Sequence, residues 1–489
     1  MNVLFIFSLN DIQSANKPLS TPEQAQLGIS YISSLLKTRG HDTRLLILSS
    51  TLQSKNYRII NDYLKEFYPK IICFTAVSSE YPFIEKMARF IRSHFPEIYL
   101  VVGGPHVSMN PEGILGVFDA LCIGEGEFPT VELVAQLEKG QHPLEIKNIW
   151  VKKGGEIEKN EPRPFLENLD ILPFPDREMW QEWIDDKAEP GARYSVLLGR
   201  GCPFECTYCC NHTLKRVAPG QYVRFRSPDN IIREIKEISE RYPTKKEIYL
   251  EIETIGINAN WAIDLCSKLE EFNSTLNKPI SFGTNLRITP NADLEDLFIA
   301  FKKSNFRFIN IGLESGSERI RREVLKRNYS NEDVVRTVKL ARNHGCKVSL
   351  FNMIGIPGET IEDFKETVRI NQVCMADWHL TSIFYPYPGT ELYFSSKRQG
   401  LLKENSHTLM ERWEATLDLP GFSKKQIQKS YIWFDYYAFK GIKPIHKILA
   451  RVLMSKFRSK YYTAFIYNKL VQFSLFRWMR KNLSDRLNS

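Results

Sequence analysis

Long apolar runs are missing from this chain of 489 residues. No window offers about 18 consecutive apolar residues, so the sequence predicts no membrane-spanning helix. The opening stretch, MNVLFIFSLN, lacks the basic start and the small-residue cleavage site of a secretory signal, and we interpret it as a buried strand. We therefore expect a cytoplasmic protein, and the length predicts two or three domains of about 150 residues each.

Cysteine is scarce outside one short segment. Four of the nine cysteines lie in GRGCPFECTYCC, residues 199–210, and the others stand singly among apolar residues. In a reducing compartment a cysteine is more often a metal ligand or a packed thiol than a disulfide partner. We expect core packing for the five single cysteines: Cys73, Cys122, Cys266, Cys346 and Cys374.

A net positive charge is also missing, except near the C-terminus. The whole chain carries a net charge of +9, but from Gly421 onward 15 lysines and arginines face two acids, a net charge of +13. The preceding part is therefore slightly acidic. Any argument for a polyanion or a membrane surface concerns the tail alone.

What the first 140 residues do contain is an alternation of strand-length apolar runs with amphipathic segments. The first helical segment is expected to begin with Thr21 as N-cap and Pro22 at its first position, and to stop at Gly40. Five such strands alternating with helices predict a parallel, doubly wound, Rossmann-like α/β domain over residues 1–140.

Glycines gather where the predicted strands of this domain end. In a doubly wound sheet, ligands bind beyond the carboxyl ends of the strands, and glycine lets a ligand approach the backbone closely. Tight turns that bind nothing would have the same composition, so both interpretations stand at this point. The candidate positions are Thr75, Gly103, Gly104, His106, Gly124 and Glu125.

The alternation stops between residues 141 and 190, where a predicted hairpin around Gly154-Gly155 precedes a proline-rich stretch that we interpret as a linker. It resumes over residues 191–395 with six strand-length runs. Six β/α units predict a partial TIM-type (β/α)6 barrel, with chemistry at the carboxyl ends of the strands. The cysteine-rich segment follows the first of these strands, so it is expected at that end.

The spacing of the clustered cysteines is Cys202-x3-Cys206-x2-Cys209. It differs from the two CxxC pairs typical of structural zinc, although a zinc ion with Cys210 or His212 as fourth ligand is an open alternative. Three thiolates on one loop suit an iron–sulfur cubane whose fourth iron has no protein ligand. Such an open iron is a place for a substrate or cofactor to coordinate.

Cys-x3-Cys-x-aromatic-Cys after the first strand of a barrel resembles the radical S-adenosylmethionine (SAM) superfamily. In that family the three cysteines hold a [4Fe-4S] cluster, the open iron binds SAM, and electron transfer cleaves SAM to a 5′-deoxyadenosyl radical. The resemblance assigns the cluster to Cys202, Cys206 and Cys209. It places Tyr208 beside the adenine, and it gives Cys210 no role.

Two further segments of the barrel resemble the same superfamily. INIGLESGS, residues 309–317, is similar to the strand that helps to hold SAM, and GIPGET, residues 355–360, is similar to the turn along the adenine. A strand-end glutamate that only caps the following helix is the alternative for Glu314. The residues that the resemblance assigns to SAM are Gly312, Glu314, Ser315 and Ile356, with Arg287 near its carboxylate and Glu253 near its amino group.

The N-terminal region resembles the cobalamin-binding branch of the superfamily through LGISYISSLLKTRGHD, VVGGPHVS, CIGEGEFPTVELV and LPFPDRE. The resemblance implies a flavodoxin-like cobalamin domain in which the glycine-rich strand ends contact the cofactor. The Asp-x-His-x-x-Gly loop that supplies a cobalt ligand in many relatives is absent after the first strand. His106 is therefore either an axial ligand or a helix-capping residue.

This resemblance implies methylation of an unactivated carbon through methylcobalamin and the deoxyadenosyl radical, with a flavodoxin or ferredoxin as electron donor. A cyclisation or rearrangement with the same cofactors but without methyl transfer is the first alternative. A non-catalytic cobalamin-binding or membrane-binding module is the second. The sequence does not choose among lipid-like, tetrapyrrole, peptide and small-metabolite substrates.

After Pro420 the alternation ends and helical periodicity takes over, and we predict a basic, α-helical C-terminal domain over residues 396–489. Amphipathic basic helices favour peripheral contact with an anionic membrane, whereas packing on the barrel with a solvated basic face is equally compatible. No nucleic-acid motif is present, so we expect no nucleic-acid partner. One apolar stripe comprises Ile445, Ile448, Leu449, Val452 and Leu453, and a second comprises Phe465, Ile466, Leu470 and Phe473.

Overall fold

The computed structural model describes residues 1–10, 12, 14–185, 193–244, 246–290, 292–402 and 410–459. Its chain divides into two compact units. The first unit comprises Met1–Ala192 and Cys210–Arg226, and the second comprises Arg193–Cys209 and Ser227–Ser489. The chain therefore leaves the first unit before the cysteine-rich loop, returns to it directly after Cys209, and leaves it again after Arg226.

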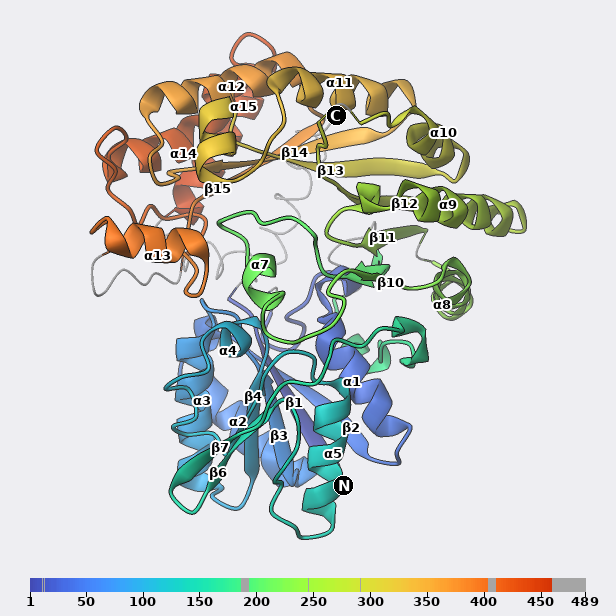
Figure 1. Ribbon diagram of the computed structural model, residues 1–489, viewed down its shortest axis with the longest axis vertical. Coiled ribbons are helices and arrows are strands. Elements are labelled where there is room, and N and C mark those ends of the chain that lie inside the picture. Colours follow the sequence, from blue (N-terminus) through green and yellow to red (C-terminus); the bar gives the residue numbers. More distant parts are fainter. Residues whose placement is uncertain are drawn as a thin grey trace. The chain divides into compact units, whose positions relative to one another are not determined.

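The sheet of the first unit contains β1 (Asn2–Ser8), β2 (Asp42–Leu48), β3 (Ile71–Thr75), β4 (Tyr99–Gly103), β5 (Ala120–Cys122), β6 (Ile149–Lys153) and β7 (Glu156–Lys159). Its strand order is β2-β1-β3-β4-β5-β6-β7 (Figure 1). The first five strands are parallel, and β6 and β7 are antiparallel additions at the edge. The parallel part has the flavodoxin-like order, which confirms the predicted fold class.

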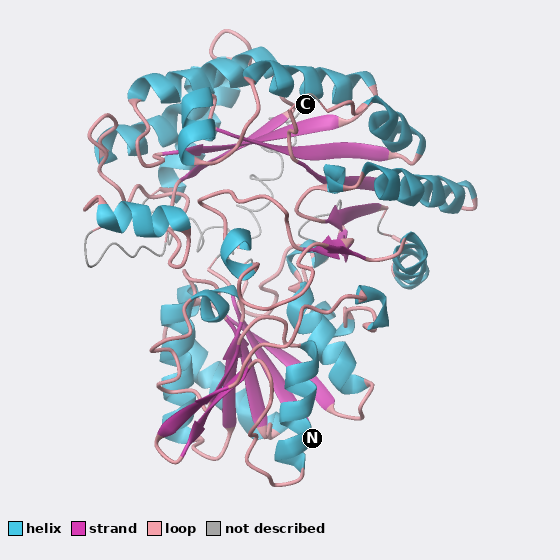
Figure 2. Ribbon diagram, viewed as in Figure 1, coloured by secondary structure: helices cyan, strands magenta, loops and turns pink. Residues whose placement is uncertain are grey.

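Helices cover both faces of this sheet (Figure 2). They are α1 (Leu27–Lys37), α2 (Lys55–Phe67), α3 (Tyr81–His94) and α5 (Glu127–Glu138), with the short α4 (Pro105–Met109) after β4. Val3 and Phe5 of β1 pack in the same core as α1 and α5, whereas Leu4 and Ile6 pack with α2 and α3. Because both faces are buried, the strands are continuous apolar runs, which is why they were predictable.

The start of the first helix differs from the prediction. Thr21 does form a capping box, but it caps a short 3-10 helix, Pro22–Gln24, after which Ala25 is extended with φ −62° and ψ 131°. The α-helix itself begins at Leu27, because the Gln26 side chain accepts a hydrogen bond from the Ile29 amide, and it ends at Lys37. The prediction of one continuous helix from Thr21 was therefore wrong.

The stretch that was interpreted as a linker contributes to the first unit. Its predicted hairpin is confirmed as β6 and β7, joined at Gly154 and Gly155, whose φ angles of 55° and 94° are those that a two-residue hairpin turn needs. Farther along, the fully buried Trp180 donates from Nε1 to Ser30 Oγ at 2.8 Å. The segment after the hairpin thus packs against α1 and forms part of the first unit.

The second unit contains six parallel strands: β8 (Tyr194–Leu197), β11 (Glu247–Glu251), β12 (Ser281–Leu286), β13 (Phe306–Glu314), β14 (Lys347–Ile354) and β15 (Trp378–Ile383). They follow one another across the sheet in chain order. The helices between them are α8 (Pro228–Arg241), α9 (Ala259–Ser274), α10 (Glu295–Lys303), α11 (Asn331–Asn343) and α12 (Ile361–Cys374). No pairing of β15 with β8 occurs among the described residues, so the predicted partial (β/α)6 barrel is confirmed and is open.

The C-terminal part of the described chain is helical, as predicted, with α13 (Glu391–Arg398), α14 (Lys424–Phe439) and α15 (Ile445–Arg458). Phe434 and Phe439 of α14 are buried in the core that α14 shares with α12 and β15, and α15 lies beside α14. The predicted second stripe, Phe465 to Phe473, lies outside the described residues. No helix in the ranges given above is long and apolar enough to cross a bilayer.

The five single cysteines are all buried, which confirms their predicted packing role. Burial raises the pKa of the Cys73, Cys122 and Cys266 thiols to about 12. The same cause raises the pKa of Cys346 and Cys374 to about 11. These thiols stay protonated at neutral pH and are poor metal ligands.

We expect Gly104→Ala to lower the thermal midpoint of unfolding more than Gly113→Ala does. Both glycines have positive φ, 100° and 80°, but a Cβ at Gly104 would lie 2.8 Å from the Ala76 carbonyl oxygen, whereas nothing lies within 4 Å at Gly113. Both variants carry the backbone strain of about 1 kcal/mol, and only the first adds a clash. Equal losses, measured by scanning calorimetry, would contradict this account of the β4–α4 turn.

Candidate functional site

The three predicted cluster cysteines lie on one loop of the second unit, after β8 and the short β9 (Gly199–Arg200). None is in a disulfide; Cys206 is buried, while Cys202 and Cys209 are partly exposed. Burial, with smaller contributions from the charges of Glu253, Cys209 and Cys206, raises the pKa of the Cys202 thiol to about 11, although a hydrogen bond from the Phe204 backbone opposes the shift.

Three thiols on one loop, none of them in a disulfide, fit an iron–sulfur cluster, whose sulfur ligands bind different iron atoms. Within the described ranges, no group of three or more His, Cys, Asp or Glu side chains converges closely enough to hold a single metal ion. The zinc alternative therefore gains no support. Its proposed fourth ligands, Cys210 and His212, belong to the segment that folds with the first unit.

Arg287, directly after β12, contacts the cysteine loop. Its Nη1 donates to the Cys206 sulfur at 2.8 Å, and its guanidinium carbon lies 3.8 Å from the ring centre of Phe204. The Arg287 amide donates to Thr254 Oγ1 at 2.8 Å, which fixes the backbone. A cation in this position stabilises negative charge on the Cys206 sulfur.

Glu314 ends β13 in an unusual conformation. Its φ is 59°, in the left-handed region, and the register between β13 and β14 shifts between Gly312 and Glu314. The carboxylate folds back over Gly312, where a Cβ would lie 2.4 Å from Glu314 Oε1. The Gly-x-Glu pattern thus has a steric cause: only glycine leaves room for this carboxylate.

The carboxylate of Glu314 is held by Arg327, a residue that the sequence analysis did not identify. Arg327 Nη1 donates to Glu314 Oε1 and to the Tyr208 hydroxyl, both at 2.8 Å, and Nη2 donates to the Gly312 carbonyl at 3.1 Å. Burial alone lowers the pKa of the guanidinium, but Tyr208, Tyr329 and Glu314 raise it, so the net shift is upward and Arg327 stays charged. Glu314 therefore pairs with a cation and does not simply cap a helix.

The residues after Glu314 form a tightly packed turn. Ser315 is fully buried, and its Oγ accepts from the Ser317 amide at 3.2 Å. The Gly316 amide donates to Thr367 Oγ1 of α12 at 2.8 Å, and a Cβ at Gly316 would lie 2.4 Å from the Glu366 carbonyl oxygen. The structure thus uses the predicted Ser315 hydroxyl within the turn itself.

The turn after β14 is organised by Glu359. Its Oε2 accepts from the amides of Gly355 and Ile356 at 2.5 and 3.1 Å, while Oε1 is buried without a hydrogen-bond partner. Burial raises the pKa of Glu359 to about 8, although the two amide hydrogen bonds oppose this shift. Ile356 is itself fully buried, so the predicted SAM contact at this residue stays a prediction.

In the first unit, the predicted cobalamin residues lie at the carboxyl ends of β3, β4 and β5. Thr75 ends β3, and its Oγ1 would be 2.9 Å from a Cβ at Gly104. His106 Nδ1 lies 3.0 Å from Ser78 Oγ, and its ring is 4.6 Å from that of Tyr81. Adjacent parallel strands bring these groups to one edge of the sheet, where such folds bind ligands.

Glu125, another predicted cobalamin residue, forms a buried ion pair. Arg224 Nη1 lies 2.9 and 3.1 Å from its two carboxylate oxygens, and the Leu166 amide donates to Oε2 at 2.9 Å. Its neighbour Gly124, with φ 79°, donates from its amide to Ser108 Oγ at 2.9 Å. The Glu125–Arg224 ion pair thus holds one segment at the end of β5. This segment contains α7 (Asn211–Leu214) and β10 (Arg224–Phe225).

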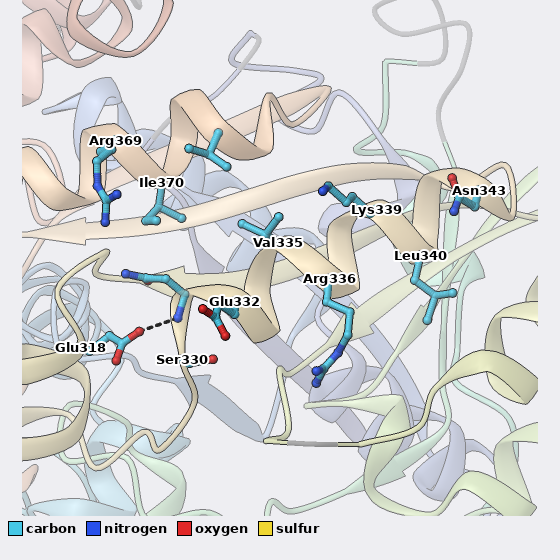
Figure 3. A pocket seen from close by; sticks show the side chains of 12 residues that line it. Glu318, Ser330, Glu332, Val335, Arg336, Lys339, Leu340, Asn343, Arg369 and Ile370 are labelled. Atoms are coloured by element: carbon cyan, nitrogen blue, oxygen red, sulfur yellow. Dashed lines mark hydrogen bonds between the residues drawn. The ribbon is translucent and has the colours of Figure 1, made fainter.

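A separate groove of about 960 Å³ lies between α11 and α12 (Figure 3). Side chains of both charges point into it, including Glu318, Glu332, Arg336 and Arg369. It contains none of the predicted site residues and lies on the helices rather than at the strand ends. We therefore do not assign the chemistry to it.

Two family models match the chain. The B12 binding domain matches residues 21–134, and the radical SAM superfamily matches residues 196–370. The first match falls within the first unit and includes Thr75, His106 and Glu125. The second begins in β8 and includes the cysteine loop and the strand ends with Glu314 and Ile356.

Among curated relatives, an uncharacterised methyltransferase of Pyrococcus horikoshii is 27% identical over 442 residues, covering 89% of this chain and 92% of that protein. The hopanoid C-3 methylase of Methylococcus capsulatus is 25% identical, covering 76% of this chain and 69% of that protein. The solved structure of the methyltransferase TsrM from Kitasatospora setae, with cobalamin and a [4Fe-4S] cluster bound, has a TM-score of 0.63 at 16% identity, covering 81% and 75% of the two chains. This last likeness shows the fold.

We expect Arg327→Met to destabilise the second unit by about 3 kcal/mol, because it leaves the Glu314 carboxylate, which is only 16% exposed, without its cation. Arg327→Lys keeps the charge but not the three hydrogen bonds, and it should cost less. Arg369→Met, at an exposed position on α12, is the matched control and should leave the thermal midpoint within about 1 °C. A stable Arg327→Met protein would show that the network does not hold the strand end.

Glu359 predicts a pH-dependent stability. The pKa of Glu359 is about 8 in the folded protein and 4.5 in the unfolded chain. Its contribution to the free energy of unfolding is therefore fully present below about pH 4.5 and is lost as the pH rises to about 8. Glu359→Gln mimics the protonated carboxyl and does not titrate. The wild type minus variant difference in free energy of unfolding should therefore fall between pH 5 and 8, by at most about 1.4 kcal/mol per pH unit. A difference that is constant over this range, measured by urea unfolding, would contradict the raised pKa.

Proposed function

Because this chain belongs to the radical SAM proteins that carry a B12-binding domain, we propose that it is a cobalamin-dependent methyltransferase acting on an unactivated carbon of an organic substrate. One observation carries the proposal. Three thiols outside any disulfide share a loop with Tyr208, and Arg287 donates to one of them, at the same strand ends as the Glu314–Arg327 pair. The relatives named as methyltransferases support methyl transfer.

In this proposal Cys202, Cys206 and Cys209 hold the [4Fe-4S] cluster. When bound, the cluster and SAM supply a 5′-deoxyadenosyl radical, and cobalamin supplies the methyl group. Arg287 stabilises the Cys206 thiolate through its hydrogen bond to the sulfur. Cys210 binds no metal.

The SAM-binding group is proposed at the strand ends around the cluster loop. Glu314 offers its carboxylate to SAM, and Arg327 holds that carboxylate in place; Glu253 is proposed near the amino group of SAM. Tyr208, fixed by the same guanidinium, presents its ring to the adenine. The remaining proposed contacts are Gly312, Ser315, Ile356 and Arg287.

Cobalamin is proposed at the carboxyl edge of the first unit's sheet. Thr75, Gly103 and Gly104 line this edge, and Gly104 has the positive φ and the crowded surroundings of a backbone that admits no side chain. Gly124 belongs to the same edge, and Glu125 positions it through Arg224. His106 is proposed to orient the β4–α4 turn through Ser78 rather than to ligate cobalt.

For the substrate and the partners we propose chemical classes rather than individual molecules. A lipid-like substrate is favoured by the similarity to a hopanoid methylase, and a tetrapyrrole is the alternative. Reduction of the cluster requires a one-electron donor, and a flavodoxin or ferredoxin supplies it. The proposed domain division stays that of residues 1–140, 141–190, 191–395 and 396–489.

The test is anaerobic reconstitution of the full-length protein with iron, sulfide and hydroxocobalamin, followed by SAM and dithionite. The wild type should retain cobalamin on desalting and form 5′-deoxyadenosine. Cys206→Ala should lose the cluster absorbance and at least about 99% of that product, because a cluster needs all three thiolates. Cys210→Ala, one residue beyond the triad, is the matched control and should keep both.

Each outcome has a definite meaning. Loss of function in Cys210→Ala would assign it as a ligand and contradict the triad. No SAM cleavage by fully loaded wild type would favour the binding-module alternative. A product from a candidate substrate without the added mass of a methyl group would favour cyclisation or rearrangement.

A further inference from the structure

Large apolar side chains are exposed along one side of α15. Of the fourteen large exposed hydrophobic residues in the described chain, five lie between residues 442 and 457, and no other helix carries as many. Their exposed fractions are between 41% and 53%. The five are Ile442, Ile445, Leu449, Leu453 and Phe457, which we call the outer stripe. Ile442 precedes the helix, and the four-residue spacing of the other four places them on one side of α15.

The outer stripe is not needed to hold α15 in place. Ile448 and Val452 are 2% and 6% exposed and belong to the same buried core as Phe434 and Phe439 of α14. Arg451 Nη1 adds a 3.1 Å ion pair with the buried Asp435 of α14. The helix is therefore anchored by one edge of its apolar face, and the other edge stays open to solvent.

The chain segment that carries the outer stripe has only positive charges of its own, although the buried Asp435 of α14 pairs with one of them. Residues 440–458 contain six lysines and arginines and no aspartate or glutamate. Asp435 neutralises Arg451, but Lys440 and Lys456 are exposed. Contiguous apolar surface beside unpaired basic residues is the composition of helices that bind anionic bilayers.

We propose that α15 docks the protein on a membrane surface that contains anionic phospholipid. The outer stripe enters the acyl region, while the lysines lie at the phosphate groups. A second copy of the chain is a poorer occupant, because a symmetric pairing through α15 would bring twelve basic side chains together with no acid from residues 440–458. This inference does not depend on the proposed cofactors.

The experiment is flotation of the full-length protein with vesicles of phosphatidylcholine, with and without phosphatidylglycerol. The wild type should float only with the anionic vesicles. Leu449→Glu with Leu453→Glu should lower the bound fraction at least about tenfold, because two leucines proposed to enter the acyl region are replaced by charges that the phosphates repel. The matched control, Ile299→Glu with Val373→Glu, changes two exposed apolar residues of α10 and α12 and should float like the wild type.

Three results would overturn the proposal: wild type that does not float, equal binding by the outer-stripe variant, or equal loss in the control. If the wild type is a dimer by light scattering and the outer-stripe variant a monomer, the occupant is a second copy instead. Lys447→Gln with Lys456→Gln leaves the outer stripe intact and removes two positive charges. This variant should therefore lower the fraction of protein that floats with anionic vesicles. None of these measurements requires SAM cleavage, so failure here and failure of the proposed function are distinguishable.

Discussion

A single buried guanidinium, that of Arg327, joins the parts of the candidate site in the second unit. It reaches the cysteine loop through the Tyr208 hydroxyl, the end of β13 through Glu314, and the backbone of that strand through Gly312. A buried cation is tolerated only when it is paired and hydrogen-bonded, so these three partners and Arg327 require one another. The left-handed backbone of Glu314 and the glycine two residues before it both follow from the position that this pairing imposes on the carboxylate.

Much of the fold was accessible from the sequence because strands buried on both faces are recognisable apolar runs. The flavodoxin-like order and the partial barrel followed from the alternation of those runs with helices. The start of α1 was not accessible, because the capping box at Thr21 is genuine and only the extended Ala25 separates it from the helix. Local patterns identify a cap, but they do not reveal which helix it caps.

The candidate site was accessible only where its residues are close in the sequence. The cysteine triad and the Gly-x-Glu strand end were found by spacing, whereas Arg327 is 119 residues from Tyr208 and has no pattern of its own. Periodicity likewise placed Leu453 and Val452 in one stripe, although one is 53% exposed and the other 6%. Which edge of an amphipathic helix is covered depends on the neighbouring helix, and a single sequence does not contain that information.

The chain passes from the first unit to the second and then returns to the first, and this path constrains the order of folding during synthesis. Glu125 cannot find Arg224 until 99 further residues have been made, by which time β8 and the whole cysteine loop have already been synthesised. The first unit therefore cannot complete its fold as an independent N-terminal domain, and its last piece arrives after the second unit has begun. A fragment that ends at residue 192 would expose the surface that the segment Cys210–Arg226 covers. The segment Cys210–Arg226 thus becomes available to the first unit only after the first strand of the second unit has been synthesised.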